Sequence, residues 1–80
     1  MRRYYFHLRD GTDQVLDPEG VELSQEAIAP AVLAAARDCM AGDVHRGELD
    51  LRYRIDVEDG TGRIVHSRAF TDALEIIPPA

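Results

Sequence analysis

The chain has 80 residues, a net charge of −6 and 45% apolar residues, ten of them alanine. This composition predicts one folded domain over residues 1–80 with a thin core, because short chains bury a small share of their surface. The negative charge argues against general nucleic-acid binding, which depends on clustered positive charge. Cys39 is the only cysteine, so an internal disulfide is excluded and a cysteine-based zinc site is disfavoured.

The N-terminal half predicts a strand, a turn, a second short strand and another turn. Residues 3–9 alternate with a period of two, as in a half-buried strand with Tyr4 and Phe6 in the core. "RDGTD" at 9–13 and "DPEG" at 17–20 are typical turns, and they flank a short strand at 14–17.

One helix follows. Ser24 is a suitable N-cap, and the helix is expected to run to about Ala41, with Gly42 as its stop. Pro30 removes a helical hydrogen bond, so we expect either a distorted first turn or a regular helix beginning nearer Ala29. The expected buried stripe and the residues beside it are Ile28, Val32, Ala35 and Cys39, then Leu33, Ala36 and Met40.

The C-terminal half predicts a β-hairpin: a strand at 51–58, a "DGTG" turn at 59–62 and a returning strand at 63–70. The preferred register leaves the four turn residues outside the ladder. A one-residue change in the loop would instead turn Val65, Ser67 and Ala69 inward. The pairs in the preferred register are Glu58–Arg63, Val57–Ile64, Ile55–His66, Tyr53–Arg68 and Leu51–Phe70. Residues 71–76 are consistent with one helical turn capped by Thr71.

These elements predict an α+β fold. Its small antiparallel sheet has the order β-β-α-β-β, one alanine-rich helix packs on one face, and a short helical turn ends the chain. No apolar run approaches the ~20 residues of a membrane span. "MRRYYFHL" lacks the continuous apolar region of a signal peptide, so we expect a cytoplasmic protein.

Five segments, taken in chain order, are "RYYFHLRDG", "DPEGVELS", "GELDL", "IDVEDGTGRIV" and "FTDALEI". Together they resemble a family of short alphaproteobacterial proteins catalogued only as a domain of unknown function. The chain resembles this family over nearly its whole length, which implies a small cytoplasmic α+β protein and no assigned activity. It departs from the pattern at Pro30, and at His66 and Arg68, where apolar residues are usual. A weaker likeness in layout alone connects it with antitoxin domains of the HicB type.

The residue types that carry catalysis or bind metals give weak patterns here. Cys39 and His45 could form a nucleophile and base, but Cys39 belongs to the apolar stripe and no third residue orients the histidine. Four acids between residues 10 and 19 do not have the spacing of a calcium loop. The three histidines are far apart in sequence. We therefore predict no enzyme activity, no metal and no cofactor.

The outer face of the predicted sheet is the candidate binding surface. Alternation places an aromatic ring, an imidazole and three guanidinium groups on it: Tyr5, His7, Arg9, Arg52 and Arg54. Three interpretations remain open. The arginines pair with Asp56 and Glu58 on a solvated face, or the face forms a protein interface, or it binds nucleic acid or another anion.

The preferred hypothesis is a non-enzymatic module that acts by binding a protein partner, including a second copy of itself as a homodimer. The alternative is a small regulatory or antitoxin-like protein that contacts nucleic acid through the arginine and tyrosine face.

Overall fold

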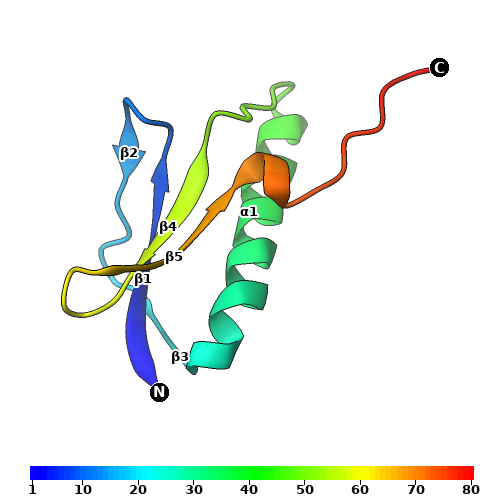
Figure 1. Ribbon diagram of the computed structural model, residues 1–80. Helices are drawn as coiled ribbons and strands as arrows, with labels where there is room; N and C mark the ends of the chain where they lie inside the picture. The colour runs from blue at the N-terminus through cyan, green and yellow to red at the C-terminus, as the bar shows by residue number, and fades with distance from the viewer.

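One antiparallel sheet and one long helix make up most of the computed structural model, which describes all residues from 1 to 80. The helix lies on one face of the sheet (Figure 1), and the predicted α+β class is confirmed. A third short strand before the helix is an addition to the predicted order. The elements are β1 (Arg2–Arg9), β2 (Gln14–Val15), β3 (Val21–Leu23), η1 (Gln25–Ala27), α1 (Ile28–His45), β4 (Arg54–Glu58), β5 (Ile64–Ala69) and η2 (Phe70–Asp72), where η denotes a 3-10 turn.

β1 connects the two halves of the chain. The strand order is β2-β1-β4-β5, and β3 also pairs with β1. β2 pairs with the end of β1, where Val15 lies opposite Leu8, and β3 pairs with its beginning, where Val21 lies opposite Tyr4. The segment 16–20 between β2 and β3 leaves the ladder and passes beside the middle of β1. The predicted "DPEG" turn thus lies against the central strand.

The helix differs from its prediction at both ends. Residues 25–27 form the 3-10 turn η1, and Ser24 makes no side-chain capping bond. Pro30 is the third residue of α1, within the first turn, where a missing N–H breaks no intrahelical bond. Gly42 does not stop the helix. The helix continues for one more turn, to His45. Gly47, with φ +86°, follows the end of the helix.

The β4–β5 hairpin has a shorter loop and a different register from the prediction. The Asp59 N–H donates to the Arg63 carbonyl at 2.9 Å, so Asp59 rather than Glu58 lies opposite Arg63. This change alone would invert the faces of β5. A bulge at Val65 inverts them again, since Ile64 lies opposite Glu58 and His66 lies opposite Val57.

As a result, the predicted burial of the returning strand is only partly correct. His66 and Arg68 face the helix side, as predicted, although with different partners from those expected. Ile64 is turned outward and is 44% exposed, whereas Phe70 is buried. β4 itself begins at Arg54, so residues 51–53 precede the strand instead of extending it.

The core lies between α1 and the β4–β5 half of the sheet. One helix face contributes Ile28, Val32, Ala36 and Met40, so Ala36 and Met40 take the central positions that were expected for Ala35 and Cys39. The other members of the core are Tyr4, Ile55, Val57, Phe70 and Ala73. Leu74 still packs against this core, and the rest of the C-terminal segment then leaves the body (Figure 1). None of the helices combines the length and the apolar character of a membrane-spanning segment.

Candidate functional site

The structure brings four of the five predicted site residues onto one sheet face. Here the outer face means the side of the sheet away from α1. In the β1–β4 ladder Tyr5 lies opposite Glu58, His7 opposite Asp56 and Arg9 opposite Arg54. Strand alternation puts these side chains on the outer face, because their neighbours Ile55 and Val57 are in the core.

Arg52 does not belong to this face, which corrects the prediction for that residue. It precedes β4, and its guanidinium pairs with the Asp50 carboxylate at 2.8 Å. The side chain of Arg52 is 77% exposed. The period-two pattern of residues 51–58 suggested a strand for the whole range, but Asp50 holds the backbone and side chain of Arg52 in a turn.

Asp56 is the centre of the outer face. Its carboxylate accepts hydrogen bonds from Arg9 Nη1 at 3.0 Å, Arg54 Nε at 3.1 Å and the Ser67 hydroxyl at 2.6 Å. Burial raises the pKa of Asp56, but the bonds from Ser67, Arg9 and Arg54 outweigh it and hold that pKa below its usual value. One buried carboxylate thus pairs with two guanidinium groups, as in the interpretation in which the arginines pair across the strands, although Asp56 itself is buried rather than solvated.

His7 is held by hydrogen bonds on both ring nitrogens. The Asp17 N–H donates to Nδ1 at 3.1 Å, and Nε2 lies 3.1 Å from a carboxylate oxygen of Glu58. Since Nδ1 accepts a bond, the proton of the neutral ring lies on Nε2 and is donated to Glu58. The Tyr5 ring stacks on His7 with an interplanar angle of 8°. These contacts fix an imidazole that is only 6% exposed.

Asp17 fastens the 16–20 segment to β1. One carboxylate oxygen accepts the Phe6 N–H at 3.2 Å, and the other accepts the N–H groups of Glu19 and Gly20. Burial raises the pKa of Asp17, but the bonds from Gly20, Phe6 and Glu19 together lower it below its usual value. The sequence analysis missed this role. The available signal was an aspartate that begins a four-residue turn ending in glycine.

Gly20 completes the same turn. Its φ is +71°, and a Cβ at this position would lie 2.8 Å from the Tyr4 carbonyl oxygen and 2.9 Å from the Tyr5 ring. Only glycine combines this backbone angle with so close an approach. The "DPEG" turn is therefore a brace for the central strand and for the ring stack on the outer face.

The remaining residues considered for catalysis or metal binding either lie apart from one another or form structural hydrogen bonds. Burial, with Asp43 and Asp38 nearby, raises the pKa of the Cys39 thiol and keeps it protonated at neutral pH. Asp10 accepts the N–H groups of Thr12 and Asp13 in the first turn. No three His, Cys, Asp or Glu side chains are arranged to hold a metal ion.

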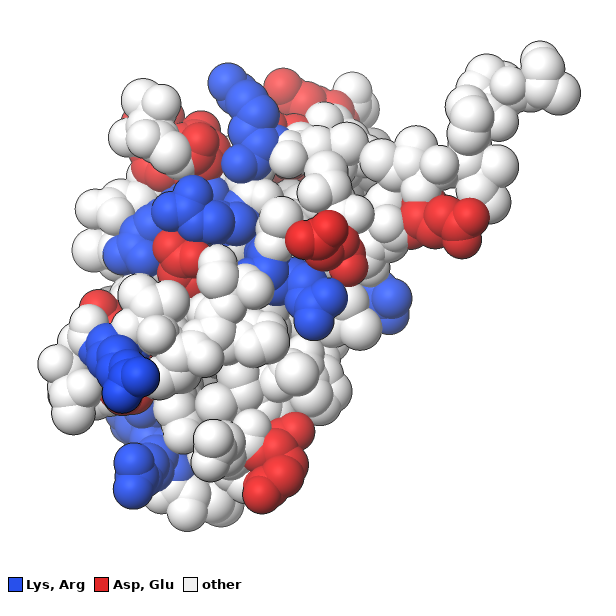
Figure 2. All heavy atoms as spheres, viewed as in Figure 1, with Lys and Arg blue, Asp and Glu red and all other residues white.

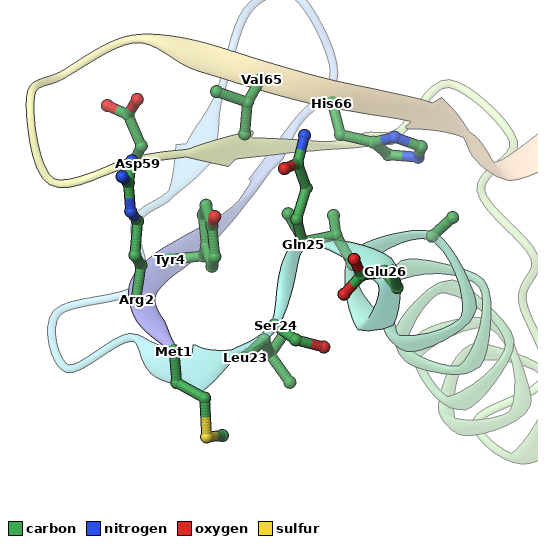
Figure 3. Close-up of a pocket in the computed structure, with 12 residues that line it drawn as sticks. Met1, Arg2, Tyr4, Leu23, Ser24, Gln25, Glu26, Asp59, Val65 and His66 are labelled. Carbon is green, nitrogen blue, oxygen red and sulfur yellow. The ribbon is translucent and has the colours of Figure 1, made fainter.

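An open cavity of about 550 Å³ lies where the start of α1 approaches β1 and β5 (Figure 3). Its lining mixes apolar, acidic and polar groups, including Tyr4, Glu26, Asp59, Val65 and His66. His66 Nε2 is buried without a hydrogen-bond partner. The cavity shows no single charge preference, but it opens beside β5, at the edge of the sheet.

The chain belongs to the family described as Domain of unknown function (DUF6894), whose model matches residues 3–71. The matched residues include the outer face, the 16–20 segment and both strands of the hairpin. No curated protein and no solved structure matches the chain.

Proposed function

We propose that the protein is a non-enzymatic interaction module that associates with a second copy of itself. The main observation in favour of this proposal is that the protein exposes about as many large apolar residues as there are residues in its buried apolar core. Nine residues form the buried apolar core, while ten large apolar residues are exposed. In a small domain with a thin core, burial against a partner adds the stability that the isolated chain lacks.

Six of the ten exposed apolar residues form three pairs of sequence neighbours. Ile64 and Val65 lie at the start of the edge strand β5, and Ile76 and Ile77 lie in the segment beyond η2. Val15 and Leu16 form a third pair at β2. Clusters of this kind mark interaction surfaces more often than single exposed side chains do.

The placement of the reactive groups supports a binding role over catalysis. Cys39 is a protonated, partly buried thiol, and His7 is fixed by Asp17 and Glu58. Asp56 is occupied by two arginines and a serine. A catalytic base or nucleophile needs a free position near substrate, and none of these groups offers one.

The outer face of the sheet supports the nucleic-acid alternative less well than it supports a protein partner. Arg9 and Arg54 share the Asp56 carboxylate, and arginine and acidic side chains are interleaved on the face shown in Figure 2. Phosphate binding favours unpaired, clustered positive charge. A binding role for Tyr5, His7, Arg9 and Arg54 stays a prediction, with a protein partner as the preferred ligand.

Sedimentation equilibrium of the full chain, over a concentration series through the micromolar range, tests the proposal. We expect the average mass to rise from one chain toward two and to change little with salt, because apolar burial drives the contact. A chain that remains monomeric throughout the series would overturn the proposed self-association. A titration with single-stranded oligonucleotide at low salt tests the alternative, and we expect no binding.

A further inference from the structure

β5 presents an open edge. It is the last strand of the sheet and pairs only with β4, so its other edge carries backbone N–H and C=O groups with no strand beside them. Such an edge is a template for an added strand. Ile64 and Val65 are exposed at its start. A strand added along this edge would satisfy these backbone groups and would end next to the two exposed apolar side chains.

Arg68, in β5, lacks a carboxylate. Its Nη1 donates only to the Asp72 carbonyl at 3.3 Å, and its Nε is buried without an acceptor. The other two partly buried arginines, Arg9 and Arg54, both pair with Asp56. Buried donors without an acceptor are rare and destabilising. An acidic side chain next to Arg68 would supply the missing acceptor for its Nε.

The segment Leu74–Ala80 has the features that complement this edge. It leaves the body in an extended course (Figure 1), and Ile76 and Ile77 are 56% and 78% exposed. Glu75 is its one charged side chain. Fully extended, the four residues before its two prolines span about 13 Å, which is about two thirds of the roughly 20 Å of the six-residue β5. The segment thus offers backbone groups, a carboxylate and apolar side chains to the C-terminal two thirds of this strand.

The same chain does not fold this segment back onto its own β5. Arg37 Nε donates to the Ala73 carbonyl at 2.8 Å, and Ala73 is buried in the core. This contact sets the point at which the segment leaves the body. A second copy is the remaining source of the segment.

We propose that the segment Leu74–Ala80 of one copy pairs antiparallel with β5 of a second copy, with Glu75 opposite Arg68, and that the exchange is reciprocal. The inference rests on the proposed self-association and names the contact that produces it. In this register Ile76 lies opposite Ser67, and Ile77 lies opposite His66. Two prolines, which have no N–H, end the pairing after Ile77.

This register places the side chains of Ile76 and Ile77 in different environments. Side chains alternate along a strand, so Ile77 shares the helix side with His66, while Ile76 points to the other side. His66 and Val65 line the cavity at the start of α1, as Figure 3 shows. Ile77 therefore lies at the mouth of this cavity, where its side chain is buried on pairing.

Charge reversal in trans tests the pairing of Glu75 with Arg68. The variants Glu75→Arg and Arg68→Glu should each raise the dimer dissociation constant. A pair of this kind is worth about fivefold, and its two occurrences in a symmetric dimer make the change about 25-fold. Mixing the two variants should restore association as a heterodimer, because each contact then joins opposite charges. Tagged chains and sedimentation measure the mixed species.

Two further comparisons keep the test decisive. Ile77→Asp should weaken association much more than its matched control Ile76→Asp, and equal effects would overturn the register. If Arg68→Glu fails to fold in a circular dichroism melt, Arg68→Gln replaces it, and Glu75→Arg should then have little additional effect. A wild-type dimer that is indifferent to both charge reversals would overturn this contact and leave self-association standing. A wild-type monomer would overturn both.

Discussion

At the scale of single residues, two glycines with similar backbone angles have different roles. Gly20 and Gly11 have φ values of +71° and +94°, but only Gly20 has atoms within 4 Å of the position of an added Cβ. Gly20→Ala should lower the free energy of unfolding by about 2–3 kcal/mol, through backbone strain plus collision with β1. Gly11→Ala, the matched control, should cost about 1 kcal/mol. Equal losses of unfolding free energy for the two variants in urea would contradict the inferred close packing of Gly20 against β1.

Asp56 is the residue whose removal should disturb the outer face most. Asp56→Ala leaves Arg9 and Arg54 without their shared carboxylate. The expected cost is about 2–3 kcal/mol, less than for a fully buried pair because the Arg54 side chain is 42% exposed. Ser67→Ala removes one hydrogen bond and should cost about 1 kcal/mol. Chemical denaturation of both variants measures the difference, and a silent Asp56→Ala would mean that the face is held by other contacts.

At the scale of elements, the sequence predicted types better than boundaries. The periods of β1 and α1 were strong enough to place both elements, and four of the five site residues followed from the alternation of β1 and β4. Arg52 was misplaced because a local side-chain bond to Asp50 competes with the strand pattern. The bulge at Val65 could not be predicted, since it depends on how Asp59 closes the loop.

Pro30 illustrates how position within an element decides the effect of a residue. It occupies the first turn of α1, where its missing N–H has no intrahelical acceptor to lose. Pro30→Ala should therefore change the free energy of unfolding by less than about 1 kcal/mol. Ala34→Pro, an exposed position farther along the same helix, should cost about 3 kcal/mol or more. Thermal melts of the two variants measure the contrast, and a large loss for Pro30→Ala would contradict the helix start.

At the scale of the whole molecule, aspartates are the anions that hold the turns and the outer face. Asp17 is partly buried and Asp56 is buried, and in both the bonds from N–H groups, arginines or a hydroxyl outweigh the effect of burial on the pKa. Asp10, Asp50 and Asp59 lie in turns and are only partly exposed, and hydrogen bonds lower each pKa, that of Asp50 to about 2. The fold thus binds fewer protons than the unfolded chain as acid is added.

This difference sets the acid response of the protein. Because the folded-state pKa values lie below the ordinary value of 3.8, the ionised aspartates stabilise the fold fully above that value. Their contribution is lost as the pH falls through the lowered values. We expect the urea midpoint to fall steeply below about pH 4 and to depend less steeply on pH in Asp17→Asn and Asp56→Asn. A midpoint that rises or stays level from pH 4 toward pH 2 would show that these carboxylates do not hold the fold.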